Sequence, residues 1–193
     1  MGNTLRFHVK YLCFCLALMG AFLGCSRELT DAEREQKSLE LFQELGKELR
    51  TELTQAVQAK GPENAIQVCA KISPQIEEKI SKESGLQLRR ISDKNRNPNH
   101  APLEWEKEVL AQWAKEMEKG AVPAVFRQKL NGEFRVMKPI ILDNPTCLKC
   151  HGEPGKDINQ ATLERIQSEY PNDKAKGYKL GDLRGAFSAS WRI

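Results

Sequence analysis

The short stretch CLKCH, residues 147–151, carries the side chains of this chain that are best suited to chemistry. Cys147 and Cys150 are separated by two residues, and His151 follows directly. Thiols at this spacing can reach the two vinyl groups on one edge of a porphyrin, and the adjacent imidazole can ligate the iron. The pattern therefore predicts one covalently attached haem c, with thioethers at Cys147 and Cys150 and His151 as the proximal ligand.

The same residues allow three other interpretations. A structural zinc site needs four ligands, and the sequence has no second C-x-x-C or H-x-x-x-H pair. A redox-active dithiol is favoured at a helix start beside a βαβ pattern, whereas this pair lies between NPT and GEPG. A disulfide between Cys147 and Cys150 in an exported protein without haem stays open as an alternative. Haem is the favoured interpretation.

The N-terminus predicts export. Arg6 and Lys10 precede an apolar run at residues 11–22, which is too short to span a bilayer comfortably and is typical of a signal peptide. The stretch FLGC that follows resembles a bacterial lipobox, so we expect residues 1–24 to be removed and Cys25 to be lipidated. Ser26 after this cysteine favours the outer membrane, and we expect the chain to face the periplasm. Export supports the haem, because c-type maturation takes place outside the cytoplasm.

Residues 25–193 are enough for a single domain with one core. The chain has 30 basic and 26 acidic side chains, and two of the basic ones, Arg6 and Lys10, leave with the signal. The remaining charge is close to balanced, which argues against a nucleic-acid partner. Apart from the pair in the motif, the mature chain keeps Cys69, a thiol without a partner.

The hydrophobic periodicity predicts an α+β fold. Apolar residues at three- and four-residue spacing indicate a long amphipathic helix over residues 28–60, opened by a capping box at residues 30–33 and stopped by Gly61. An Asn-Gly pair at residues 131–132 predicts a β-hairpin, and we place the C-x-x-C-H motif in the loop behind it. Further helices are expected over residues 62–72, 73–85, 102–120 and 161–170, further strands over 85–91 and 184–193, and a loop without regular structure over 92–102.

The second face of the iron needs a ligand or stays open for a gas. Met117 and Met137 occupy apolar positions of a helix and a strand, and core packing explains both. His100 lies in a polar loop and is either a ligand or simply solvated. Cys69 lies on the apolar face of a helix, where a cysteine is most often a small buried hydrophobe. A ferric haem would nevertheless explain an unpaired thiol in an exported protein, because iron(III) stabilises a thiolate.

Four blocks of the sequence together resemble a known family. AIQVCAKISPQI, RRISDKNRNPNHAPLEWE, CLKCHG and YPNDKAKGYKLGDLRGAFSAS are similar, in this order, to exported single-haem c-type cytochromes with a PAS-like fold, a domain long catalogued as of unknown function. The resemblance covers nearly the whole mature chain. It implies a PAS-like antiparallel sheet flanked by helices, a covalent haem c with His151 on the proximal side, and Cys69 as the distal ligand.

The resemblance also concerns the haem pocket. It implies that the loop RNPN at residues 96–99, with Arg96 and Asn97, lines the pocket. Arg89, Arg90 and Arg96 could pair with the haem propionates, which guanidinium groups suit, and the alternative is that they are solvated surface charges. His100 directly follows this loop, and its binding to the iron would displace Cys69 from the distal role.

Outside the motif, the sequence shows no set of nucleophile, base and orienting group, so we do not expect an enzyme. The first hypothesis is a redox or small-ligand sensor, in which the Cys69 thiolate leaves the iron upon reduction and an unknown signalling or redox protein reads the change. The second is a periplasmic electron-transfer cytochrome c with permanent ligands. The third is a structural lipoprotein that has a disulfide and no haem.

Overall fold

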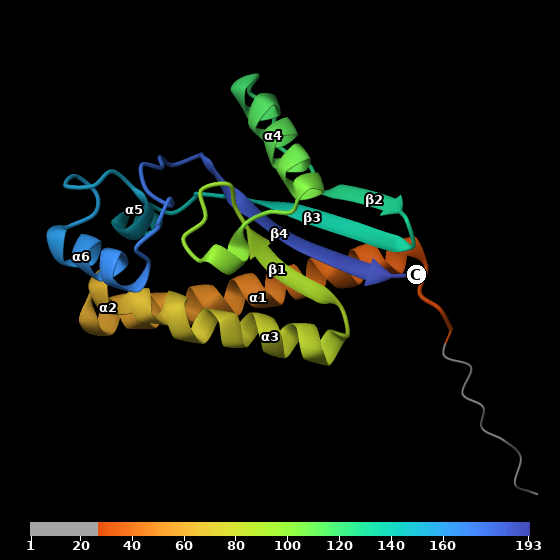
Figure 1. The fold of residues 1–193 in the computed structure, drawn as a ribbon, viewed down its shortest axis with the longest axis horizontal. Helices are drawn as coiled ribbons and strands as arrows, with labels where there is room; N and C mark the ends of the chain where they lie inside the picture. The colour runs from red at the N-terminus through yellow and green to blue at the C-terminus, as the bar shows by residue number, and fades with distance from the viewer. Residues whose placement is uncertain (1–26) are drawn as a thin grey trace, which may run out of the picture.

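The computed structural model describes residues 27–193, so the predictions for the signal peptide and for Cys25 lie outside the described residues. The elements follow one another along the chain as Figure 1 shows. They are α1 (Asp31–Lys60), α2 (Pro62–Gln67), the π-helix η1 (Val68–Ile72), α3 (Ser73–Ser84), β1 (Gln87–Ile91), the 3-10 helix η2 (Pro98–His100), α4 (Glu104–Glu118), β2 (Phe126–Leu130), β3 (Glu133–Ile141), α5 (Pro145–His151), α6 (Gln160–Glu169) and β4 (Leu183–Arg192).

The four strands form one antiparallel sheet in the order β1-β4-β3-β2. The strands β2 and β3 form the predicted hairpin, in which Leu130 pairs with Glu133. The two turn residues have positive φ angles, 53° for Asn131 and 74° for Gly132. A two-residue turn of type I′ requires this left-handed backbone at both central positions, and Asn-Gly tolerates it best. The sequence signal for this hairpin is confirmed.

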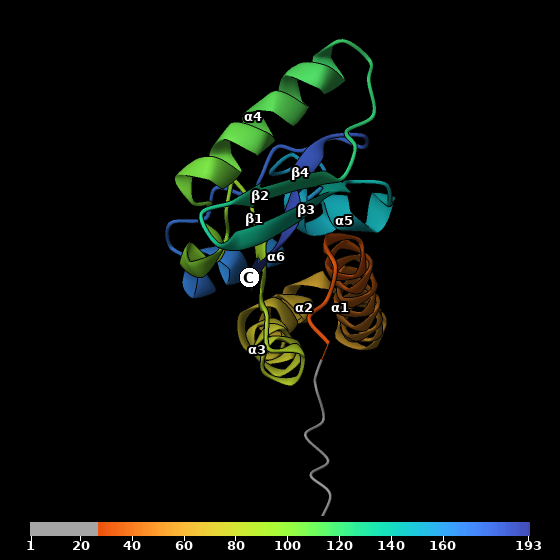
Figure 2. The same cartoon turned by 90° about the vertical axis from the view of Figure 1, so that its right-hand side faces the viewer.

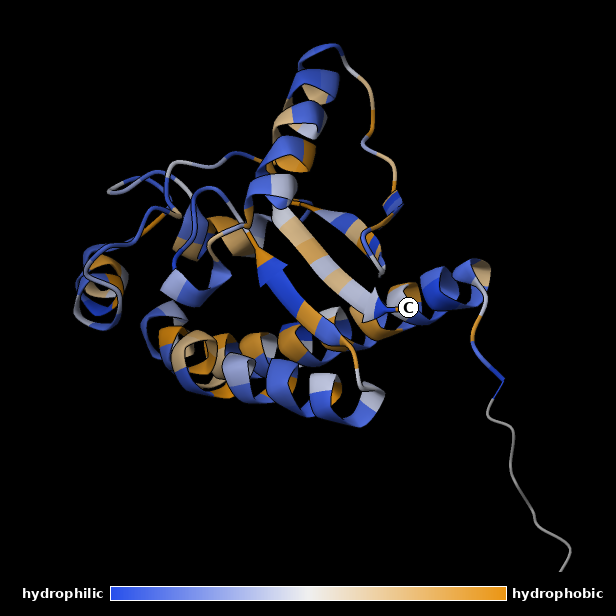
Figure 3. Cartoon of the chain, turned by 45° about the vertical axis from the view of Figure 1, so that its right-hand side comes forward, coloured by the Kyte–Doolittle hydropathy of each residue, from blue (hydrophilic) through white to orange (hydrophobic). Residues whose placement is uncertain are grey.

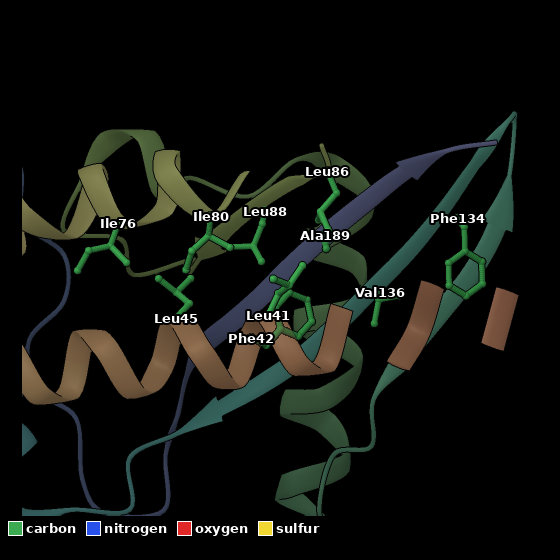
Figure 4. Close-up of a cluster of buried hydrophobic side chains, with 10 residues drawn as sticks. All are labelled: Leu41, Phe42, Leu45, Ile76, Ile80, Leu86, Leu88, Phe134, Val136 and Ala189. Atoms are coloured by element: carbon green, nitrogen blue, oxygen red, sulfur yellow. The ribbon is translucent and has the colours of Figure 1, made fainter. Parts of the chain in front are cut away.

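Helices cover both faces of the sheet (Figure 2): α1 and α3 lie on one side and α4 on the other. Successive strand residues point to opposite faces, so Val136 packs toward α1 and α3 while Met137 packs toward α4. Figure 4 shows the larger of the two cores, in which Leu41, Phe42 and Leu45 of α1 face the sheet. The fold class is therefore confirmed as α+β, with an antiparallel sheet, flanking helices and a long N-terminal helix.

The long helix α1 begins where the sequence predicts. Thr30 Oγ1 accepts a hydrogen bond from the Glu33 amide at 3.3 Å, and the Glu33 carboxylate accepts one from the Thr30 amide at 2.8 Å. Each partner satisfies an amide that the first helical turn leaves without an acceptor, and such a cap contributes about 1 kcal/mol. Hydrophilic and hydrophobic residues alternate along its turns, as Figure 3 shows. Within residues 27–193, no helix combines the length and the apolar character needed to cross a bilayer.

The core on the α4 side contains a buried ionic group. The side chain of Glu106 is 1% exposed and forms a salt bridge with Arg89. It also accepts hydrogen bonds from Ser188 Oγ at 2.6 Å and from the Leu103 amide at 2.7 Å. A buried carboxylate is tolerated when its oxygens are paired in this way. The network links α4 to β1 and β4.

The structure corrects three local expectations. The motif at residues 147–151 lies in the helix α5 and not in a loop, because Asn144 caps the Thr146 amide at 2.8 Å and Pro145 presets the first helical φ. The segment at 62–72 is not one regular helix, since it continues from α2 into the π-helix η1. The loop at 92–102 contains η2, which Asn97 caps through the Asn99 amide.

Candidate functional site

The helix α5 lies at the end of the sheet that is remote from the C-terminus, close to α2 and α6 (Figure 1). Cys147 packs against an apolar cluster of Leu142, Ala175 and Tyr178. Cys150 packs against a second apolar cluster, which consists of Ile66 of α2, Ile166 of α6, and Ile158 and Tyr170 on either side of α6. Both thiols are free and half-buried in the structure. The helix therefore stands between two small cores and carries one cysteine in each.

The orientation of His151 is set by a backbone carbonyl. Its Nδ1 atom lies 2.9 Å from the Ala175 oxygen. A carbonyl oxygen can only accept, so Nδ1 carries the hydrogen and Nε2 presents its lone pair. Burial lowers the pKa of His151 well below its ordinary value, and the charges of Arg184 and Arg96 act in the same direction. The imidazole is therefore neutral at neutral pH, which is the form that binds a metal.

The segment that carries Ala175 is fixed to α5 by further hydrogen bonds. The Tyr178 amide donates to the His151 carbonyl at 2.9 Å, and the Gly177 amide donates to the Gly152 carbonyl at 2.8 Å. The Tyr178 ring meets the His151 ring edge-on, with 6.3 Å between centroids. We call residues 173–178 the strap, because this segment crosses the C-terminal end of α5 and holds the histidine.

A buried ion pair holds the strap in turn. Arg96 Nε donates to Asp173 Oδ1 at 3.0 Å, and the Arg96 guanidinium also donates to the Cys150 carbonyl at 2.6 Å and to the Ala175 carbonyl at 3.2 Å. Asp173 Oδ1 accepts the Ala175 amide at 2.9 Å. Both charged side chains are almost fully buried, with exposures of 6% and 0%. Arg96 is thus the residue that joins the motif to the strap.

Gly152 is required by a close approach directly behind the motif. A Cβ atom at this position would lie 2.5 Å from Asp157 Cβ and 2.8 Å from the Leu148 carbonyl oxygen. Glycine is therefore the one residue that lets the chain leave α5 here without displacing its neighbours. The Asp157 carboxylate accepts a hydrogen bond from the Glu153 amide at 2.9 Å, which fixes the turn.

Cys69 lies on the π-helix η1, and its neighbour Ala70 packs against the same apolar cluster as Cys150 of the motif. It is free and half-buried. Burial is the main cause that raises the pKa of Cys150 to about 11; Arg96 opposes the rise, and the charge of Cys69 adds to it. Burial likewise raises the pKa of Tyr170 to about 12, and Cys69 is the next contributor. Single-turn π-helices occur often at functional sites, and the periodicity of apolar residues cannot reveal one.

The other predicted residues are divided between the two faces of β1. Arg90 points toward α3, where it donates to Glu77 at 2.6 Å and to the Ser73 hydroxyl, and its charge acts on His151. Arg89 points to the opposite face and pairs with Glu106. The structure therefore brings Arg90 and Arg96 to the site and leaves Arg89 away from it.

The remaining candidates have local partners. His100 Nε2 lies 3.1 Å from Glu77 Oε2. Burial raises the pKa of Glu77, but the hydrogen bond from His100 and the charge of Arg90 outweigh it, and the pKa lies below its ordinary value. The Asn97 side chain caps η2. Met137 is fully buried in the core facing α4, and Met117 is half-buried in α4 itself.

Sequence reasoning missed three parts of the site: Asp173, the Ala175 carbonyl and Arg184. The sequence around these residues does not mark them as parts of a site. Their roles depend on contacts with segments that are distant in the sequence. Arg184 is the second residue of β4, and after burial its charge is the largest cause that lowers the pKa of His151.

The residues around α5 fit a covalently attached haem. The two thiols are free, and His151 Nε2 makes no hydrogen bond to any residue between 27 and 193. Arg96 Nη1 is buried and has no hydrogen-bond partner among residues 27–193. Such an orphaned donor, on a side chain that also binds the carbonyl that orients His151, suits the carboxylate of a bound group. Residues 27–193 hold no group of three or more His, Cys, Asp and Glu side chains that could bind a metal ion by themselves.

The fold and the site together define a class of small α+β proteins with a thiol and imidazole motif at one end of the sheet. The structure is similar to the crystal structure of the cyanobacterial heme-protein Tll0287, with a TM-score of 0.65 and 23% sequence identity over 83% of this chain and 95% of that chain. This likeness shows a common fold. A comparison with curated proteins gives no match. Residues 27–191 match the Tll0287-like family (Tll0287), and the chain belongs to this family.

Proposed function

We propose that the chain is a c-type haem protein, in which Cys147 and Cys150 form the thioethers and His151 is the proximal ligand. One observation carries the proposal: the Ala175 carbonyl holds His151 as a neutral imidazole with Nε2 free, directly behind two free thiols. A histidine that binds a metal through one ring nitrogen typically donates the N–H of its other ring nitrogen to a carbonyl or carboxylate. The description of a structural relative as a heme-protein supports the same conclusion.

We further propose that Cys69 is the distal ligand. Its neighbour Ala70 packs against the same apolar cluster as Cys150, and this common packing supports the assignment. When bound, the haem would supply a one-electron couple between iron(III) and iron(II). The chain supplies the ligands, and its buried arginines supply positive charge close to His151.

The role that we propose is a redox or small-ligand sensor, without catalysis of its own. With the haem bound, Cys69 would serve as a thiolate ligand in the oxidised protein. After a redox partner donates one electron, its Sγ atom would take up a proton from solvent and withdraw. Its place in η1 supports this movement, because a π-helix carries one residue more per turn than its α-helical surroundings and can change register. The change would be read by another protein.

We propose that the protein works outside the cytoplasm. The basic and apolar pattern of residues 1–24 and the cysteine at position 25 support export and lipid anchoring at the periplasmic side of the outer membrane. The near balance of basic and acidic side chains in the rest of the chain gives no support to nucleic-acid binding.

The test is a comparison of oxidised and reduced protein. The full chain is produced together with a c-type maturation apparatus, and its intact mass, absorption and paramagnetic-resonance spectra are recorded for wild type and Cys69→Ala. We expect one covalent haem in both, and a low-spin thiolate signature only in oxidised wild type. Ile72→Ala, an exposed change in the same π-helix, is the matched control and keeps the signature.

The possible results separate the three functions. Equal spectra for wild type and Cys69→Ala would show that Cys69 is not an iron ligand. The protein would then be an electron carrier whose ligands do not change. A wild-type mass without added haem would overturn the whole proposal and leave a lipoprotein with a Cys147–Cys150 disulfide.

A further inference from the structure

Arg184 carries a positive charge that the structure does not neutralise. It is half-buried at the start of β4, and its guanidinium lies 5.4 Å from the centre of the Tyr178 ring. One of its nitrogens lies 3.4 Å from the Lys94 carbonyl oxygen. No carboxylate of residues 27–193 is within ion-pair distance of it. Burial lowers the pKa of Arg184, and the charges of Arg96 and Arg90 act in the same direction although Tyr178 opposes them.

Arg96 offers a hydrogen-bond donor to the same region. Its Nε and one terminal nitrogen are used by Asp173, Cys150 and Ala175, whereas Nη1 has no partner in residues 27–193. The side chain is 6% exposed, so water does not readily replace the missing acceptor. Arg90 differs from both, because Glu77 and Ser73 already occupy its guanidinium.

Both guanidinium groups act on His151, because the charge of each lowers its pKa. Arg184 stacks beside Tyr178, whose ring meets the His151 ring edge-on, and Arg96 binds the carbonyl of Cys150, the residue before the histidine. Arg184 and Arg96 place excess positive charge in a partly buried region, and Nη1 of Arg96 is a donor without an acceptor. An anion that accepts hydrogen bonds would satisfy both. Guanidinium groups bind carboxylates in particular, through parallel N–H···O bonds.

We propose that Arg184 and Nη1 of Arg96 together bind a carboxylate beside His151, and that a haem propionate is this carboxylate. The inference rests on the haem attachment proposed above. It assigns the role to Arg184, which lies in β4, and excludes Arg89, which points to the other face of the sheet and is paired with Glu106. Arg184, the second residue of β4, would then make the sheet part of the haem site.

The experiment uses the full chain after maturation and compares Arg184→Gln with Arg192→Gln. Arg192 is exposed at the opposite end of the same strand and serves as the control. Three quantities are measured: haem per chain by mass, the midpoint potential, and the propionate bending band in the resonance Raman spectrum. For Arg184→Gln we expect a full haem complement, a shifted propionate band and a lower potential, because the loss of a nearby positive charge favours the oxidised state. Arg192→Gln changes none of these quantities.

The results also separate this inference from the proposal beneath it. A wild-type chain without haem contradicts the proposed function itself. A wild-type chain with haem, combined with an unchanged propionate band and potential in Arg184→Gln, overturns the carboxylate site alone and leaves Arg184 as a packing partner of Tyr178. Should Arg184→Gln fail to accumulate, Arg184→Lys decides: a shifted band with the potential kept supports the site, and an unchanged band overturns it.

Discussion

The Nδ1 atom of His151 lies 2.9 Å from the carbonyl oxygen of Ala175, a residue 24 positions further along the chain. The contact fixes the rotation of the ring and leaves Nε2 as the acceptor atom. The carbonyl is itself held in place, because Arg96 donates to it and Asp173 accepts from the amide of the same residue. The histidine of the motif is thus positioned by a segment remote in sequence.

The first prediction concerns the two histidines of the described chain. His151→Ala is expected to lose the proximal ligand, so that little haem is attached after maturation and the remaining fraction has a changed absorption spectrum. His100→Ala removes a residue that contacts Glu77, and we expect its spectrum to match wild type. Intact mass and absorption measure both. A normal spectrum for His151→Ala together with a changed one for His100→Ala would reverse the assignment.

The second prediction concerns acid stability. Burial raises the pKa of Asp173, but the hydrogen bond and charge of Arg96 outweigh it, and the pKa lies below its ordinary value. A carboxyl group whose pKa is depressed in the folded state stabilises the protein above its unfolded pKa, and this contribution is lost as the pH falls through the folded pKa. Asp173→Asn is therefore expected to be less stable at neutral pH and less sensitive to acid below about pH 4.

The control for Asp173 is Asp143→Asn, an exposed change close to the same helix. Thermal unfolding is followed from neutral pH to about pH 2, a range that includes the ordinary pKa of an aspartate. Parallel stability curves for Asp173→Asn and wild type would show that the ion pair with Arg96 has no share in acid unfolding.

The third prediction concerns the buried Glu106. Its removal in Glu106→Ala leaves Arg89 without its carboxylate partner and breaks the bond from Ser188, so the free energy of unfolding should fall by about 3–5 kcal/mol. Urea denaturation measures this change. Glu108→Ala, an exposed change in α4, is the control and should alter the free energy by less than about 0.5 kcal/mol. A loss below 1 kcal/mol for Glu106→Ala would show that the network is dispensable.

The fourth prediction concerns the membrane anchor. Cys25→Ser removes the thiol that would be acylated, and we expect the protein to move from the membrane fraction to the soluble fraction of the periplasm. Cys13→Ser lies within the predicted signal and should leave the membrane fraction unchanged. Fractionation and detection of the protein in both fractions provide the measurement. Equal distribution of wild type and Cys25→Ser would contradict lipidation.

Much of the fold was predictable because its signals are local. The capping box at Thr30, the apolar stripe of α1 and the Asn131-Gly132 turn each depend on residues a few positions apart. The helical state of the motif was missed, although the Asn144 cap and Pro145 could have indicated it. The π-helix around Cys69 leaves no periodic signal, since it depends on how the chain packs between α2 and α3.

The site was predictable only in part. The spacing of Cys147, Cys150 and His151 is a recognisable sequence motif. Ala175, in contrast, acts through its backbone oxygen, which every residue possesses and which therefore leaves no signal in the sequence. Strand alternation could have separated Arg89 from Arg90, because neighbouring strand residues point to opposite faces. Nothing comparable marks Arg184 or Asp173, whose importance arises from contacts across long stretches of sequence.

The strap, residues 173–178, leads through a short connection into β4, which begins at Leu183 and lies between β1 and β3 in the sheet. Any displacement of α5 therefore pulls on the amides of Gly177 and Tyr178 and, a few residues later, on the strand that both neighbours share. Through these bonds, a movement at the thiols would be transmitted to the interior strand of the sheet. A partner could detect the state of the motif from a surface far away from it.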